Sequence, residues 1–105
     1  MNRGDVIWHK FKEPDKIRPV LILTRNEAIS QLNALTVVPI TSTIRGVKSQ
    51  VILDEGDGMR EVCALNLDWT QTVPKRQLKE VITRLSEDRM EEVLEALKFA
   101  FGFDK

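Results

Sequence analysis

The chain has 105 residues and a mass of 12.1 kDa, enough for one domain with a thin core. Its 16 basic and 16 acidic residues give a net charge of +0, which excludes a strongly basic protein that coats nucleic acid and an acidic disordered chain. The only cysteine is Cys63 and the only histidine is His9, so an internal disulfide and a Cys/His zinc site are excluded. No apolar run reaches the ~18 residues of a membrane span and no signal-peptide pattern opens the chain, so a soluble cytoplasmic protein is expected.

The balanced total hides an uneven distribution of charge. Residues 1–50 carry a net charge of +4, and residues 51–105 carry −4. The basic half would suit a surface that faces an anion such as RNA phosphate. Two solvated faces that happen to differ in sign would give the same count, so charge alone leaves both interpretations open.

Short apolar runs separated by turn residues predict a series of strands. The expected strands cover residues 6–11, 19–24, 35–41, 50–53, 61–67, 71–73 and 79–85, the last being either a strand or the lead into a helix. The second run is apolar on both faces, which indicates a central strand with Pro19 at its first residue. Pro39 indicates an edge or a bulge near the end of the third strand.

Two helices and one turn complete the prediction. Asn26 is expected to cap a short helix over 27–32. Residues 54–58, rich in Asp and Gly, are the strongest turn signal. Ser86 is a good N-cap for a C-terminal helix that Gly102 would end.

The C-terminal helix is predicted to be amphipathic. Its expected apolar stripe consists of Met90, Val93, Leu94, Leu97 and Phe101. Three of the four phenylalanines lie at residues 99–103, an unusually aromatic ending. They are either packed into the core or placed at a subunit interface, and the sequence favours neither.

Many short strands with frequent turns predict a small, strongly bent barrel or sandwich, mostly β with an inserted helix and a C-terminal helix. No repeat, linker or low-complexity tract is visible, so residues 1–105 are expected to form a single domain.

Arg18 is the first residue with the chemistry of a binding site. It stands directly before Pro19 at the start of an apolar run, where the backbone has little freedom. Its fork of N–H donors suits a phosphate and stays charged at any working pH. The alternative is a surface arginine paired with Glu13 or Asp15, and residue type alone favours that alternative.

Three consecutive hydroxyl residues, 41–43, close the third strand. Hydroxyls at a strand end can donate to phosphate oxygens, although turn and capping chemistry is the commoner use. His9 could act as a general base, but its spacing offers no oriented partner. Trp8 and Trp69 could stack on bases, with core packing preferred, and Cys63 is expected to be a buried small hydrophobe.

Taken in order, these features resemble one family. The segments RGDVIWHKF, IRPVLIL, TVVPITST and CALNLDWTQTVPKRQL, followed by a terminal helix, are similar to the MazF/PemK-type endoribonuclease toxins of bacterial toxin–antitoxin systems. The resemblance spans nearly the whole chain. It implies an SH3-like small β-barrel that works as a homodimer, needs no metal or other cofactor, and is inhibited by an antitoxin with an acidic, otherwise disordered tail.

The resemblance also implies roles for individual residues. Arg18 matches the family's functional arginine, and Thr41 its functional threonine or serine. Members of the family cleave single-stranded mRNA at short motifs, leaving a 2′,3′-cyclic phosphate and a 5′-hydroxyl. Arg18 would stabilise the charge on the phosphorane oxygens, and Thr41, helped by Ser42, would hold a phosphate oxygen or the attacking hydroxyl in line.

The chain departs from the family's pattern in one loop. Only residues 12–17 separate the first strand from Arg18, where members usually have a longer loop that covers bound RNA and, in some, supplies an acidic base. Glu13 is the nearest candidate for that base. Lys12 and Lys16 are expected to compensate for the shorter loop by contacting RNA phosphates directly.

Two other functions compete with RNA cleavage. Toxins of the same fold bind and poison DNA gyrase without cutting RNA, and Arg18 and Thr41 argue against that alternative. An SH3-like module that binds proteins would need an exposed aromatic groove, and the absence of tyrosine counts against it.

Overall fold

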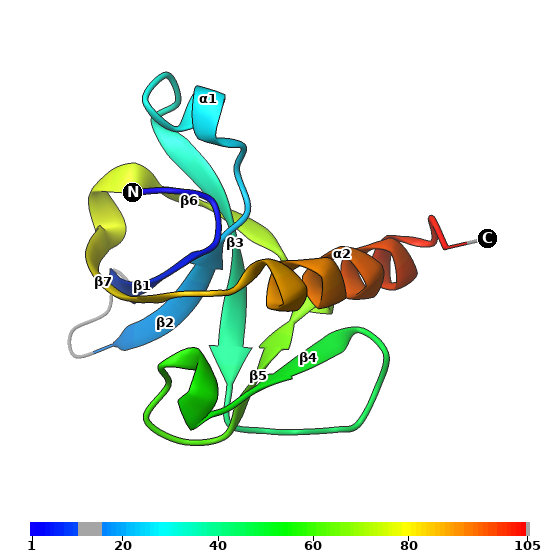
Figure 1. The fold of residues 1–105 in the computed structure, drawn as a ribbon. Coiled ribbons are helices and arrows are strands. Elements are labelled where there is room, and N and C mark those ends of the chain that lie inside the picture. The colour runs from blue at the N-terminus through cyan, green and yellow to red at the C-terminus, as the bar shows by residue number, and fades with distance from the viewer. Residues whose placement is uncertain (11–15, 105) are drawn as a thin grey trace.

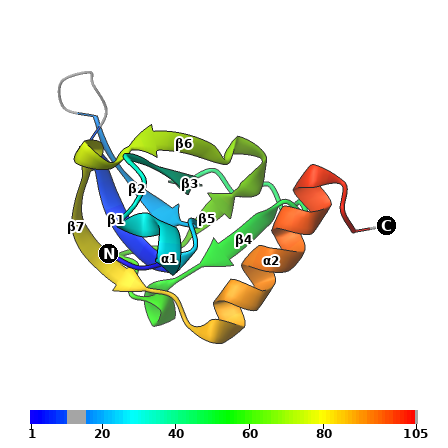
Figure 2. The same ribbon diagram turned by 90° about the horizontal axis from the view of Figure 1, so that it is seen from above.

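The computed structural model describes residues 1–10 and 16–104 and consists of a bent antiparallel sheet with one long helix beside it (Figures 1 and 2). Its strands and helices, in chain order, are β1 (Asp5–Lys10), β2 (Ile17–Ile22), α1 (Asn26–Ile29), β3 (Ala34–Thr41), β4 (Gln50–Leu53), η1 (Glu55–Asp57), β5 (Cys63–Asn66), η2 (Leu67–Trp69), β6 (Gln71–Pro74), η3 (Lys75–Gln77), β7 (Leu78–Arg84) and α2 (Glu87–Phe101). The elements labelled η are single turns of 3₁₀ helix. Every strand expected from the sequence is present, with ends that differ by a few residues.

Strand β3 is shared between three neighbours. The strand order is β4-β5-β3-β2-β1-β7, with β6 as a further partner of β3. Along one edge, β3 pairs with β6 at Ala34–Val37 and then with β5 at Ile40 and Thr41. Pro39 lies where β3 passes from β6 to β5, so the proline falls where that edge has no ladder partner, as the sequence suggested. The sheet bends there into a barrel-like form, and no ladder among the described residues joins the outer strands β4 and β7.

The three strands β1, β2 and β3 are buried on both faces, because each face carries its own apolar cluster. The cluster toward α2 includes Val6, Leu21, Val38, Leu53, Leu65 and Val93. The cluster on the opposite face consists of Ile7, Val20, Ile22, Ile29, Leu35, Val37, Val73 and Leu78. Successive side chains of a strand point to opposite faces, so alternate residues enter alternate clusters. This confirms that the second apolar run is a central strand.

Two local expectations were wrong. Strand β2 begins at Ile17, so Pro19 is its third residue, paired with Trp8 of β1. Proline is tolerated there because the ladder to β3 begins only at Val20. Asn26 does not cap α1, whose N-cap residue is Arg25 without a side-chain hydrogen bond. The Asn26 side chain instead accepts a hydrogen bond from the backbone N–H of Arg3, 2.7 Å away.

Helix α2 has both expected caps but a different buried face. The Ser86 hydroxyl accepts from the backbone N–H of Arg89, and Gly102 ends the helix in the left-handed conformation at φ 78°. The side chains turned to the core are Met90, Val93, Ala96, Leu97 and Ala100. Leu94 and Phe101 are exposed, which corrects the predicted stripe. The sequence pattern weighted large apolar residues, whereas the close approach of α2 to the sheet admits alanine at Ala96 and Ala100.

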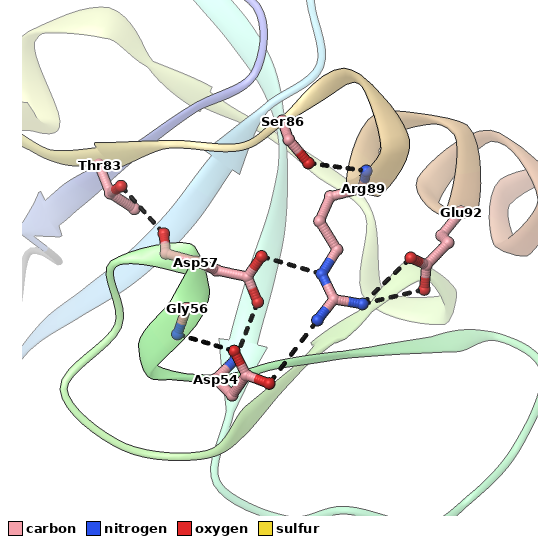
Figure 3. Close-up of polar contacts among 7 residues, drawn as sticks. All are labelled: Asp54, Gly56, Asp57, Thr83, Ser86, Arg89 and Glu92. Carbon is pink, nitrogen blue, oxygen red and sulfur yellow. Dashed lines mark hydrogen bonds and ion pairs between the residues drawn. The ribbon is translucent and has the colours of Figure 1, made fainter.

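One polar junction fastens the start of α2 to the sheet (Figure 3). The Arg89 guanidinium lies 2.9 Å from the Asp57 carboxylate in the turn between β4 and β5, and it also contacts Glu92 and Asp54. The turn is fixed in place, because the side chains and backbones of Asp54 and Asp57 cap one another and the Thr83 hydroxyl of β7 donates to the Asp57 carbonyl. A Cβ at Gly58 would overlap the Thr83 side chain, so β7 packs directly on this turn.

The same junction sets the ionisation of Asp57. Burial raises the pKa of this carboxyl, but hydrogen bonds from Arg89 and from the Asp54 backbone outweigh that effect and leave the pKa below its ordinary value. A carboxylate with a lowered folded-state pKa contributes stability at pH values above its unfolded pKa. That contribution disappears as the pH falls through the folded-state pKa.

We therefore predict that Arg89→Met lowers the free energy of unfolding at pH 7 by about 2 kcal/mol, because Asp57 keeps its burial and loses its ionic donor. The difference between wild type and variant should shrink as the pH is lowered below the ordinary Asp value of 3.8. Urea denaturation at pH 7 and at about pH 3 measures both effects. Lys98→Met is the matched control, since the Lys98–Glu95 pair lies on the exposed face of the same helix. Equal losses in the two variants would contradict the assignment.

Candidate active site on one face of the sheet

Arg18 and Thr41 come from adjacent central strands and lie on the same face of the sheet. Arg18 alternates with Val20 and Ile22 along β2, and Thr41 alternates with Leu35 and Val37 along β3. Those four apolar residues belong to one cluster, which identifies the shared face. The β2–β3 ladder pairs Val20 with Pro39. If its register continued by two more residues, Arg18 would lie opposite Thr41, where β3 already pairs with β5 instead.

Arg18 is exposed near the start of β2, and its backbone is held by a pairing with His9 of β1. Within residues 1–10 and 16–104, its guanidinium forms no ion pair and no side-chain hydrogen bond. The alternative partners Glu13 and Asp15 lie outside the described residues. No described residue occupies the N–H donors of the exposed Arg18 side chain.

Thr41 ends β3, and its side chain is half-buried. Its Oγ1 accepts a hydrogen bond of 3.0 Å from the backbone N–H of Thr43. This is the turn chemistry that the sequence allowed, but it uses only an acceptor lone pair of the hydroxyl. The O–H proton stays available for donation to an anion, so the turn interpretation and the binding interpretation are compatible.

The other predicted site residues are distributed around this pair. Ser42 is exposed directly after Thr41, and Lys16 is exposed directly before β2. Lys12, expected to contact RNA, and Glu13, the candidate base, lie outside the described residues. Among the described residues, no hydrogen bond or ion pair joins these side chains to one another, and Arg18, Ser42 and Lys16 are all exposed.

Two exposed basic residues that sequence reasoning missed lie in the segment that pairs with β1. Arg76 is exposed in η3, and Lys79 is exposed in β7. Between them lie Gln77, whose side chain contacts His9, and Leu78, which pairs with His9. Arg76 and Lys79 belong to residues 51–105, whose net charge is −4, so the net charge of each half of the chain gave no sign of them. The pairing of β1 with β7 brings the segment that holds them next to His9, the ladder partner of Arg18.

His9 has a partner that its local sequence does not reveal. Its side chain is only 2% exposed, and its Nε2 lies 2.8 Å from Oε1 of Gln77. The two residues are 68 positions apart, so no motif could have paired them. This corrects the expectation that His9 lacks an oriented partner, while its burial opposes direct proton transfer to a substrate.

The two tryptophans are exposed, whereas the cysteine is buried. Trp69 is 67% exposed and Trp8 is also exposed, so the preferred expectation of core packing was wrong for both. Trp69 is the last residue of η2, two residues before the start of β6. Cys63 is buried as expected. Burial, reinforced by nearby carboxylates, raises the pKa of its thiol, which disfavours the nucleophilic thiolate.

The aromatic C-terminal end is not packed into the core of the chain. Phe101 and Phe103 are 53% and 74% exposed, and Phe99 is exposed with Lys48 Nζ placed 5.9 Å from its ring centre. One of the two alternatives left open by the sequence, burial within the same chain, is therefore excluded. In the described part of the chain, no group of three or more His, Cys, Asp or Glu side chains is placed to hold a metal ion, and no helix has the length and apolarity of a membrane span.

Comparison with known proteins places this arrangement in context. The family model described as the PemK-like, MazF-like toxin of type II toxin–antitoxin systems matches residues 2–101. Endoribonuclease MazF3 of Mycobacterium tuberculosis is 39% identical over 90 residues, covering 86% of this chain and 87% of that protein. A second relative, named as the probable endoribonuclease MazF5 of the same organism, is 38% identical over 99 residues, covering 93% and 90%.

Solved structures agree with the sequence relatives. The structure titled Mycobacterium tuberculosis toxin MazF-mt6 superposes with a TM-score of 0.87 at 35% identity, covering 96% of this chain and 99% of that one. A mycobacterial endoribonuclease in complex with its cognate antitoxin has a TM-score of 0.88 at 22% identity, covering 100% and 98%, and supports the fold alone. These likenesses confirm a barrel-like, mostly β fold with a C-terminal helix. The family match across residues 2–101 and the identity to the two relatives show that the chain belongs to the PemK-like, MazF-like toxin family of type II toxin–antitoxin systems.

Proposed function

We propose that this toxin is an endoribonuclease that cuts single-stranded mRNA without a metal, with Arg18 and Thr41 as its catalytic residues. The observation that carries the proposal is the family match over residues 2–101, together with the placement of Arg18 and Thr41 on one open face. The names of its relatives support an endoribonuclease over a gyrase poison. As an enzyme that acts on mRNA, it works in the cytoplasm as a single domain spanning residues 1–105.

In the proposed reaction, the ribose 2′-oxygen attacks the adjacent phosphorus and the bond from phosphorus to the 5′-oxygen breaks. The 2′-hydroxyl gives up its proton to a base, and the departing 5′-oxygen takes up a proton. The products are a 2′,3′-cyclic phosphate and a 5′-hydroxyl. No oxidant, reductant or cofactor is needed, and Glu13 is the candidate base.

Arg18 and Thr41 have separate roles in this step. Negative charge accumulates on the non-bridging phosphorane oxygens, and the paired N–H donors of Arg18 would neutralise it. The absence of a described ionic partner supports this role, because the guanidinium need not abandon an internal carboxylate to bind phosphate. The Thr41 hydroxyl, with its acceptor side held by the Thr43 N–H, would donate to a phosphate oxygen, and Ser42 and Lys16 would bind flanking phosphates.

We predict that the purified protein cuts single-stranded RNA in EDTA and that Arg18→Ala lowers kcat by ~100-fold or more, the usual effect of losing a donor to developing charge. Thr41→Val should lower it by a smaller factor, since one neutral hydrogen bond is lost. A 5′-labelled RNA resolved on a gel, with end-group analysis of the fragments, provides the measurement. Arg25→Ala is the control, an exposed arginine at the N-cap of α1. Cleavage by Arg18→Ala at the wild-type rate would refute the mechanism, and tight gyrase binding without any RNA cleavage would favour the alternative.

Trp69 is proposed to stack on an RNA base, because an indole this exposed has an uncovered aromatic face. Trp69→Ala should weaken binding of a non-cleavable, 2′-deoxy-substituted oligonucleotide by ~10-fold, while Trp69→Phe should retain most of the affinity. Fluorescence anisotropy measures both. Unfolding midpoints serve as the control, since an exposed side chain contributes little to stability. Equal affinity of Trp69→Ala and wild type would remove Trp69 from the binding surface.

The proposed partners include a second copy of the chain and an antitoxin. The antitoxin complex of a structural neighbour supports an antitoxin partner, and an acidic antitoxin tail complements the basic residues around Arg18. Exposed Phe101 and Phe103 support a homodimer that covers the C-terminal end of α2.

We predict that the double variant Phe101→Ser/Phe103→Ser shifts the protein from dimer to monomer at micromolar concentration, because it removes apolar area from the interface. Sedimentation velocity over a concentration series measures the shift. Leu32→Ser, an exposed apolar residue after α1, is the matched control and should leave association unchanged. An unchanged dimer in the double variant would place the interface elsewhere.

A further inference from the structure

His9 is a buried titratable group that the proposed mechanism does not use. Asp5, His9 and Ser49 are the buried polar side chains among the described residues. Asp5 binds Arg84 and the backbone of Asn2, and Ser49 binds Asp68, so each of these two has a polar partner that links parts of the fold. A polar side chain in an apolar cluster lowers stability relative to a well-packed apolar one unless its hydrogen bonds compensate. The position of His9 therefore calls for a reason beyond packing.

The position of His9 relative to Arg18 supplies that reason. In the β1–β2 ladder, His9 and Arg18 are direct partners. Side chains of directly opposed residues project from the same face with their Cβ atoms ~5 Å apart. His9 lies on the same face as Ile7, which belongs to the cluster of Val20 and Ile22 and identifies it as the face of Arg18. The imidazole is thus the immediate neighbour of the Arg18 stem on the side of β1.

The imidazole is also held rigidly. Its Nε2 donates to Gln77 Oε1 at 2.8 Å, and Gln77 belongs to η3, whose following residue, Leu78, pairs with His9 in the β1–β7 ladder. The ring is consequently fixed by its neighbouring strands and by its hydrogen bond to Gln77, and it is almost wholly enclosed. On the other side of Arg18, Pro19 restricts the backbone to extended conformations.

We propose that His9, oriented by Gln77, is a positioning residue for Arg18. The fixed ring blocks the rotamers that would carry the arginine toward β1 and keeps its guanidinium over the open face shared with Thr41. Its function is to reduce the conformational entropy that a long side chain, free to sample many conformers in solvent, would lose on binding the substrate. This inference rests on the proposed function, because it concerns how Arg18 is aimed at the scissile phosphate.

The test is a double-mutant cycle between positions 9 and 18, measured as kcat and KM on one short RNA. His9→Leu fills similar space without the hydrogen bond and should lower kcat by ~10-fold with KM nearly unchanged. In an Arg18→Lys background, which retains charge but lacks the fork, His9→Leu should lower kcat by less than ~2-fold, because no oriented fork remains to be lost. His9→Gln, which keeps an N–H near the Nε2 position, should recover part of the wild-type kcat.

Two further variants keep the outcome decisive. Gln77→Met breaks only the hydrogen bond and should lower kcat in the same direction by a smaller factor, and it serves in place of His9→Leu if that variant does not fold. Arg84→Gln disturbs the buried Asp5 pair at the other end of β1 and is the control. It should lower the unfolding midpoint as Gln77→Met does while leaving kcat at the wild-type value.

The possible results separate the two claims. Equal losses from His9→Leu in the wild-type and Arg18→Lys backgrounds would show that His9 acts through stability alone and would overturn the positioning role. A kcat unaffected by His9→Leu and by Gln77→Met would overturn it as well. Wild-type cleavage by Arg18→Ala would instead refute the proposed mechanism itself, a result that the single variant shows without any change at position 9.

Discussion

Strand β3 imposes the constraint on which the rest of the structure depends, because eight residues must satisfy three partner strands. Its first half pairs with β6 on one edge while its middle pairs with β2 on the other, and its last two residues pair with β5. A strand can change partners along one edge only where the ladder is interrupted, and Pro39, without an N–H, lies at that interruption. The bend that follows lets the seven-stranded sheet curl into a barrel-like form with one apolar cluster on each face.

The same bend creates the candidate site. At Thr41, β3 has left the ladder to β2 and pairs with β5, while Arg18 occupies the corresponding position of β2. The polar ends of two central strands therefore emerge beside each other on the surface instead of continuing a ladder. Buried strands supply the rigidity, and their diverging ends supply the polar groups that a phosphate needs.

The helix α2 depends on a different kind of contact. The side chains that it turns to the core include two alanines, so apolar burial along this face is modest. The Arg89–Asp57 junction fixes its start to the β4–β5 turn (Figure 3). Hydrogen bonding to Asp57 and Glu92 raises the pKa of Arg89 still further above its ordinary value, so the arginine is charged whenever the protein is folded. With its first turn fixed, the helix carries Phe101 and Phe103 outward at its other end, where they are open to a partner.

The sequence by itself determined the elements and the chemistry they carry. The alternation of apolar residues, the caps Ser86 and Gly102 and the turn at 54–58 are local signals, and local signals suffice for strands, helix ends and turns. Arg18 and Thr41 are candidate site residues chosen from the sequence through an ordered resemblance, since neither stands out by residue type. Only the tertiary structure decided which residues meet: His9 with Gln77, and Arg89 with Asp57. It also decided that the large residues Leu94, Phe101 and Trp69 are exposed while Ala96 is buried. These outcomes depend on the register and approach of segments far apart in the chain, and a pattern read along one segment contains neither quantity.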